Sequence, residues 1–231
     1  MKMRNGQGEQ FFLVMGLLLL AIVIGGFLPP MLVRPGGIAS IPLLLHVHGV
    51  VFVSWFLLFC AQARLAGSGN IELHMRLGKA SVLIPSAMII LGYFVIRGAY
   101  ANPDWNIAGM TGAASVMFPF TDMLNFTIVY SLALANRRNP AAHKRLMLLA
   151  GILIIDPAVA RLVMTLEAAV PMIAVLELLL FAALFIYDVV TRRRPSWASV
   201  LGFGLFAAAL AAKLTVSQHP GWHSFVEFVF A

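Results

Sequence analysis

Seven long apolar runs alternate with short polar breaks along the chain of 231 residues. Runs of roughly 20 apolar residues match the hydrocarbon thickness of a bilayer when they are coiled as α-helices. The breaks contain Pro, Gly and Asn, which are typical of turns. The pattern therefore predicts an all-α fold in which residues 1–231 form a single domain, a polytopic membrane bundle of seven transmembrane helices. The expected spans are 11–33, 41–63, 75–98, 109–135, 144–166, 169–190 and 197–217.

Lys and Arg gather at alternate ends of these runs. Twelve lie on the side of the N-terminus: Lys2, Arg4, Arg64, Arg76, Lys79, Arg137, Arg138, Lys144, Arg145, Arg192, Arg193 and Arg194. Four lie on the other side: Arg34, Arg97, Arg161 and Lys213. The positive-inside rule then predicts a cytoplasmic N-terminus and an external C-terminus in a bacterial cytoplasmic (inner) membrane. The first run is longer than a typical signal-peptide core and no A-x-A site follows it, so we expect an uncleaved helix.

The composition supports a membrane protein and narrows its partners. Hydrophobic residues make up 61% of the chain and charged residues 11%, which excludes an ordinary soluble domain. The net charge of +7 does not indicate nucleic acid, because the basic residues lie in loops between apolar runs. We expect the lipid bilayer as partner, with anionic headgroups at the cytoplasmic face, and leave open a membrane-protein partner or a homo-oligomer. The single cysteine, Cys60, allows neither an intramolecular disulfide nor a thiolate metal motif.

Ionisable residues inside apolar runs are costly and are therefore candidates for a functional site. Depths estimated from the helical rise place several of them in the outer half of the bilayer. Imidazole and carboxylate groups suit Zn, Fe or Mn, so the candidate metal ligands are His46, His48, Asp122, Asp156 and Glu177. The expected polar pocket also includes Trp55, Gln62, Asn125, Arg161 and Lys213. The alternative is that individual acids pair with Arg161 or Lys213 and only hold helices together.

The two histidines near the start of the second span do not form a simple chelate. Positions 46 and 48 lie about 200° apart around an α-helix, so only one ring is expected to face the pocket. His48, Trp55 and Gln62 share one stripe at seven-residue spacing. We therefore favour His48. Whether His219 and His223, beyond the last span, join this pocket is left open.

A second histidine pair belongs to a weak internal repeat. LHMRLGKA opens the third span and AHKRLMLLA the fifth, each with His followed by Arg two residues later and Leu three residues later. One interpretation makes His74 and His143 the axial ligands of haem b between two helices. The other, which the surrounding basic residues favour, keeps both histidines at the interface, where the basic cluster fixes topology and binds anionic lipid.

These motifs resemble those of a group of uncharacterised bacterial multi-span membrane proteins. The shared features are V-H-x-H-[GA] with Trp and Gln further along, L-H-x-R-L-G, an Asp in the fourth span and H-K-R-L-M-L-L. Here they are His46, His48, Trp55, Gln62, His74, Arg76, Gly78, Asp122 and His143 to Leu149. The resemblance covers most of the chain and implies a bundle of about seven helices, without an established activity. A weaker likeness, to the progestin and adipoQ receptor superfamily, rests on the spacing of His219 and His223, but Pro220 and Gly221 break the helix that this spacing needs.

Three function classes follow from these residues. The leading hypothesis is a membrane protein that binds a divalent metal or haem in a redox or metalloenzyme-assembly role. The second is a membrane-embedded hydrolase in which His46 or His48, Asp122 and Asp156 surround a metal-activated water. The third is a transporter or channel in which the same acids and histidines relay protons. Whether the protein is an enzyme is left open.

Overall fold

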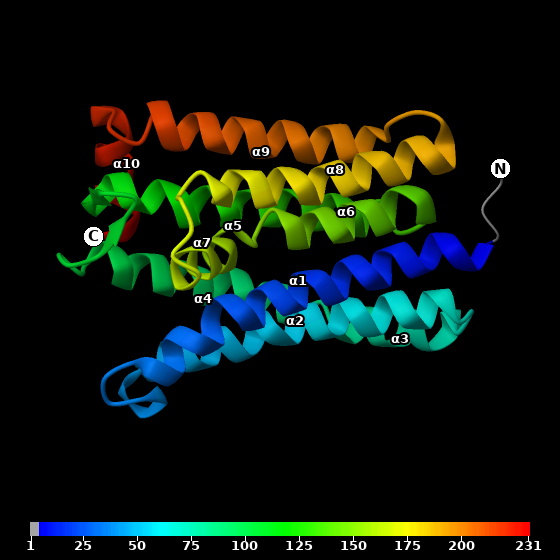
Figure 1. The fold of residues 1–231 in the computed structure, drawn as a ribbon, viewed down its shortest axis with the longest axis horizontal. Helices are drawn as coiled ribbons and strands as arrows, with labels where there is room; N and C mark the ends of the chain where they lie inside the picture. Colours follow the sequence, from blue (N-terminus) through cyan, green and yellow to red (C-terminus); the bar gives the residue numbers. More distant parts are fainter. Residues whose placement is uncertain (1–4) are drawn as a thin grey trace.

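The computed structural model describes residues 5–231, with side chains from Gln10 onward, so Lys2 and Arg4 lie outside the described residues. Almost all of the described chain is helical (Figure 1). The elements are α1 (Asn5–Val33), η1 (Ile38–Ser40), α2 (Leu43–Gly67), α3 (Ile71–Ala80), α4 (Leu83–Tyr100), β1 (Asn106–Ile107), β2 (Met110–Thr111), α5 (Gly112–Ala135), α6 (Pro140–Ile152), α7 (Asp156–Thr165), α8 (Met172–Arg192), α9 (Trp197–Thr215) and α10 (Pro220–Phe230).

Six helical segments are long and apolar enough to cross a membrane, and the number rises to seven if the bent pair α6–α7 is one span. The six are Gln10–Val33, Leu43–Gly67, Ile71–Tyr100, Gly112–Ala135, Met172–Arg192 and Trp197–Thr215. The outside of the bundle is apolar, as a lipid-facing surface must be: Val33 is 82% exposed and Leu83 77%. The prediction of a helical bundle is therefore confirmed, nearly all-α and with six or seven candidate membrane-spanning segments.

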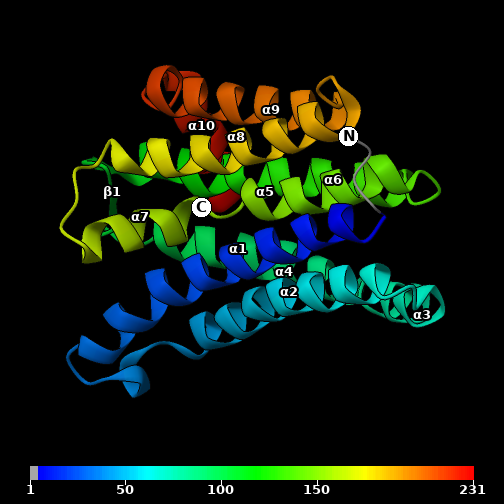
Figure 2. The same ribbon diagram turned by 45° about the vertical axis from the view of Figure 1, so that its right-hand side comes forward.

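When α3–α4 and α6–α7 are each taken as one segment, successive segments from α1 to α9 run in opposite directions along the bundle (Figures 1 and 2). The loops after α2, α5 and α8 lie together at the end where α1 begins, which we call the basic end because most of the Lys and Arg residues lie there. The loops after α1, α4 and α7 lie at the opposite end, together with the small antiparallel pair β1–β2, in which Asn106 pairs with Thr111.

Two of the expected spans are interrupted, and a proline accounts for each break. The third, expected as one helix over 75–98, consists of α3 and α4, which meet at Ser81 and Val82. Pro85 has no N–H to donate to the Ser81 carbonyl. The fifth, expected over 144–166, consists of α6 and α7, bent by 45°. Here Pro157 has no N–H for the carbonyl of Leu153, so the helical ladder is broken there.

Helix α10 lies beyond the last expected span and was not predicted. It runs across the opposite end of the bundle instead of extending α9 (Figure 1). Pro220 occupies its first turn, where a missing N–H costs nothing. Trp222, Val226 and Phe230, spaced by four residues, are buried on one face of α10. Trp222 also donates its indole N–H to the Ala113 carbonyl of α5, 2.7 Å away, which ties α10 to the bundle.

Candidate functional site

Lys213 of α9 joins two acids from two other helices inside the bundle. Its Nζ donates to Oδ1 of Asp122 on α5, 2.9 Å away, and to Oδ2 of Asp156 on α7, 2.5 Å away. Asp122 and Lys213 are buried, and Asp156 is partly buried. Three helices that are far apart in the sequence therefore meet at one ammonium group. We call Asp122, Asp156, Lys213 and the neighbouring Glu177 the acid–lysine cluster.

The break between α6 and α7 positions Asp156. It is the first residue of α7, and a helix N-terminus stabilises a negative charge. Asp122 lies between two and three turns into α5 from the opposite end, and Lys213 lies in the last turn of α9. Because α5 and α9 run antiparallel, both residues fall in the half of the bundle away from the basic end. The ammonium also lies 5.4 Å from the centre of the Phe118 ring, within cation–π range.

Glu177 of α8 gives the cluster an acid in excess. Its side chain is 8% exposed, and it lies near enough to Asp122, Asp156 and Lys213 for their charges to interact. Among the side chains described from Gln10 onward, no hydrogen bond or ion pair involves Glu177. Arg161 of α7 interacts electrostatically with Asp156, and its guanidinium donates to the Pro157 carbonyl, 2.8 Å away. These described groups comprise three acids and two cations, so one negative charge is uncompensated unless a proton or another cation binds.

The two histidines of α2 have different surroundings. Nε2 of His46 lies 3.1 Å from the Ile38 carbonyl in the loop before α2, so His46 is engaged with backbone. His48 packs against Phe52 with ring centroids 4.0 Å apart and the planes tilted by 30°, and it interacts electrostatically with Arg161. Nδ1 of His48 is buried and has no hydrogen-bond partner in the described chain. Of the two rings, His48 is therefore the one near Arg161, beside the acid–lysine cluster.

Three other members of the expected pocket have described contacts with residues outside the acid–lysine cluster. Trp55 packs edge-on against Phe126, at a centroid distance of 5.4 Å, and Asn125 donates to the Leu205 carbonyl of α9, 3.3 Å away. Gln62 lies one helix turn from the end of α2 at the basic end. Among the side chains described from Gln10 onward, no group of three or more His, Cys, Asp or Glu could hold a metal ion. The predicted metal ion therefore gains no support from this geometry.

His74 and His143 lie at the basic end in matching positions. Nδ1 of His74 on α3 is 3.4 Å from the carbonyl oxygen of Gln62 on α2. Nδ1 of His143 on α6 is 2.8 Å from the carbonyl oxygen of Ala133 on α5. Each histidine therefore opens the second helix of a helical hairpin and contacts the backbone of the first helix.

Matching N-caps extend the predicted repeat. Asn70, four residues before His74, accepts a hydrogen bond from the Leu73 N–H, and Asn139, four residues before His143, accepts one from the Ala142 N–H, both at 3.3 Å. An Asn four residues before each His is visible in the sequence, and Asn is a preferred N-cap. That signal could have strengthened the comparison of the two motifs.

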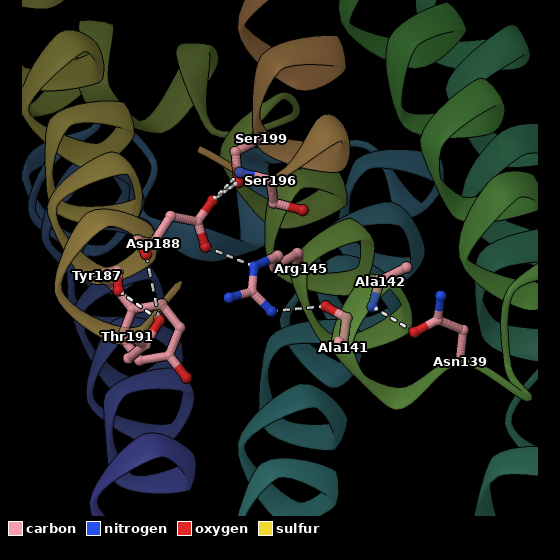
Figure 3. A network of polar contacts seen from close by, with 9 residues as sticks. All are labelled: Asn139, Ala141, Ala142, Arg145, Tyr187, Asp188, Thr191, Ser196 and Ser199. Atoms are coloured by element: carbon pink, nitrogen blue, oxygen red, sulfur yellow. Dashed lines mark hydrogen bonds and ion pairs between the residues drawn. The ribbon is translucent and has the colours of Figure 1, made fainter. Parts of the chain in front are cut away.

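A buried ionic network at the basic end was missed by the sequence interpretation (Figure 3). Asp188 of α8 is fully buried, and its Oδ1 accepts from Nε of Arg145 on α6, 2.6 Å away. Its Oδ2 accepts from the Ser196 N–H at 2.8 Å and from the Ser199 hydroxyl at 2.6 Å. Arg145 was counted only as a topology signal. The clue was an acid near the end of the sixth run, close in sequence to a Ser-rich helix start.

His219 and His223 make local contacts. Nδ1 of His219 accepts from the Gly221 N–H at 3.1 Å and so caps α10, and Nε2 of His223 lies 3.1 Å from the Ser217 carbonyl.

Fold and buried side chains together define a multi-pass helical membrane protein with ionisable groups inside its bundle. Comparisons of the chain with protein-family models, curated proteins and solved structures gave no match.

Proposed function

We propose that the protein is a membrane transporter that binds and releases a proton or a small monovalent cation at the acid–lysine cluster. The observation that carries this proposal is the bridge from Lys213 to Asp156, at the break of a bent span, and to Asp122 on another helix. Broken helices in membrane proteins commonly place ion and substrate sites near the bilayer interior. Ionisable groups at such depth commonly mark ion pathways and proton relays.

The charge balance supports a cation as the transported or coupling species. With all three carboxylates ionised, Lys213 and Arg161 leave one negative charge uncompensated, and a proton or monovalent cation restores neutrality. When that cation leaves, Lys213 and Arg161 are the two cations that remain among the described groups, and together they must compensate three carboxylates. Binding and release thus change which carboxylates Lys213 pairs with, and Asp156 transmits that change to the α6–α7 break.

The position of Lys213 favours transport over a hydrolytic role. A metal-activated water needs open carboxylate oxygens beside the metal. In this protein the Lys213 ammonium lies between Asp122 and Asp156 and already provides the positive charge there. His46, a partner in the hydrolase hypothesis, contacts the Ile38 carbonyl instead.

In the same proposal the basic end faces the cytoplasm of a bacterial inner membrane. Loops rich in Lys and Arg are retained on that side and bind anionic headgroups. The acid–lysine cluster would then lie nearer the external face, so its cation exchanges first with the outer medium.

The test is ion flux into liposomes that contain the purified protein. A potassium diffusion potential would drive protons inward, measured with an entrapped pH dye, and a parallel assay would follow labelled sodium. The Asp122→Asn and Glu177→Gln variants should lower the rate at least about tenfold, since each removes an acid that holds the cation. Asp104→Asn and Glu227→Gln make the same changes at exposed positions and should transport like the unmodified protein.

Two results would contradict the proposal. One is a flux no higher than that of empty liposomes for both ions. The other is a flux that Asp122→Asn and Glu177→Gln leave unchanged while both variants elute as folded protein from a sizing column.

A further inference from the structure

The two hairpins α2–α3 and α5–α6 present their histidines in the same way at the basic end. In each, an Asn N-cap is followed four residues later by His, and the His Nδ1 lies beside a carbonyl of the preceding helix. The imidazoles of His74 and His143 are near enough to each other to interact electrostatically. Two unrelated packing histidines would not be expected to have the same type of N-cap, the same type of contact with the preceding helix and a position at the same end of the bundle.

The backbone contacts determine which ring nitrogen is free. A carbonyl oxygen only accepts, so the Nδ1 atoms of His74 and His143 carry the hydrogen. In the neutral ring Nε2 then has a lone pair, and within the described chain neither Nε2 has a hydrogen-bond partner. An imidazole whose other nitrogen donates to a backbone carbonyl is the arrangement found in metal-ligating histidines.

Two buried polar atoms on α2, near His74 and further into the bundle, also have no partners in the described chain. Oε1 of Gln62 is buried and unpartnered among the described residues, and the carbonyl of the same residue is the contact of His74. Trp55 lies about two turns before Gln62 on the same stripe of α2 and is 1% exposed, and its indole N–H also has no partner in the described chain. A buried donor or acceptor without a partner costs free energy, so an additional ligand that reaches these atoms would be stabilised.

The number of ligands points to haem and not to an isolated metal ion. An isolated zinc ion needs about four ligands. The described chain offers the two imidazoles and no third His, Cys, Asp or Glu in a ligating group with them. A haem iron receives four nitrogens from its porphyrin and takes only two axial ligands.

We propose that His74 and His143 are the two axial ligands of a haem held between the α2–α3 and α5–α6 hairpins at the basic end. Gln62 positions His74 and offers its side-chain oxygen to the haem periphery. This site is separate from the acid–lysine cluster, so the test of haem binding does not depend on the transport proposal.

The test is titration of the purified full-length protein with haemin, followed by absorption spectra before and after reduction with dithionite. We expect one haem per chain with a low-spin, six-coordinate spectrum. His74→Ala and His143→Ala should each weaken binding at least about tenfold, by analogy with the loss of supporting residues at metal sites. His219→Asn is the matched control, because it removes a histidine while Asn can still cap α10.

Replacing one axial ligand by another separates loss of a ligand from loss of folding. His143→Met should keep a bound haem and raise its midpoint potential, since a Met axial ligand raises the potential relative to His. The proposal is overturned if haemin does not bind, if it binds with a five-coordinate spectrum, or if both Ala variants bind it as well as His219→Asn does. It is also overturned if His143→Met leaves the potential unchanged.

Discussion

At the scale of single residues, the bundle holds two buried ionic groups that differ in how completely they are paired. Asp188 accepts three hydrogen bonds, from Arg145, the Ser196 backbone and Ser199. No hydrogen bond or ion pair among the side chains described from Gln10 onward involves Glu177. Breaking a fully paired buried ion pair is strongly destabilising, because it leaves an uncompensated charge. We therefore assign a structural role to the Asp188 network and a functional one to the acid–lysine cluster.

The Asp188→Asn variant tests this structural role. It leaves Arg145 buried without an anion, and we expect the free energy of unfolding to fall by about 3–5 kcal/mol. Ser199→Ala removes one hydrogen bond to the carboxylate and should cost about 1.5–3 kcal/mol. Denaturant unfolding in detergent, followed by tryptophan fluorescence, measures both changes. Asp104→Asn, at an exposed position, is the control, and equal stability of Asp188→Asn and Asp104→Asn would contradict the assignment.

At the scale of helices, close approach of α1 to α7 depends on one glycine. A Cβ atom on Gly26 would lie 2.2 Å from the Ala158 carbonyl oxygen, which cannot move without shifting the α7 backbone. The neighbouring Gly25 is different, because its added Cβ would lie 3.5 Å from a Leu162 methyl group, an ordinary contact. Small residues at helix interfaces permit this kind of backbone approach in membranes.

These two glycines form a matched pair for mutation. Gly26→Ala should lower the thermal midpoint and destabilise the protein by about 1–3 kcal/mol, the typical cost of overpacking. Gly25→Ala should be neutral or slightly stabilising, because Ala has the higher helix propensity. Thermal unfolding of the two variants side by side measures the difference. If Gly26→Ala melts with or above Gly25→Ala, the contact between α1 and α7 is not as close as described.

The sequence predicts elements better than it predicts contacts between them. Apolar runs reveal the spans because lipid requires each helix to be apolar over its whole length. The same uniformity hides which face of a helix packs inward. That is why Trp55 and Gln62 were expected beside the acids, although Trp55 packs on Phe126 and Gln62 lies near His74. The meeting of Lys213 with Asp122 depends on the tertiary arrangement, which one sequence does not encode as a local pattern.

At the scale of the whole molecule, the position of the α6–α7 pair decides how the chain crosses the membrane. If the bent pair is one span, the loop around Glu167 lies on the side of Asp104, and seven crossings separate the two ends of the chain. In the structure that loop lies at the opposite end, as a single bent span requires, whereas a re-entrant pair would place it on the side of Arg138. The repeated excess of Lys and Arg at the basic end favours seven crossings. With a re-entrant pair, the basic loops would not all lie on the same side of the membrane.

Cysteine labelling distinguishes the two topologies. In a Cys60→Ser background, the variants Ser68→Cys, Asp104→Cys, Arg138→Cys and Glu167→Cys place one exposed thiol in each of four loops. With a membrane-impermeant maleimide on intact cells, we expect labelling of Asp104→Cys and Glu167→Cys, and labelling of Ser68→Cys and Arg138→Cys only after permeabilisation. Glu167→Cys behaving like Arg138→Cys would show a re-entrant pair. Because Asp156 begins α7, that result would change the side from which the acid–lysine cluster exchanges its cation.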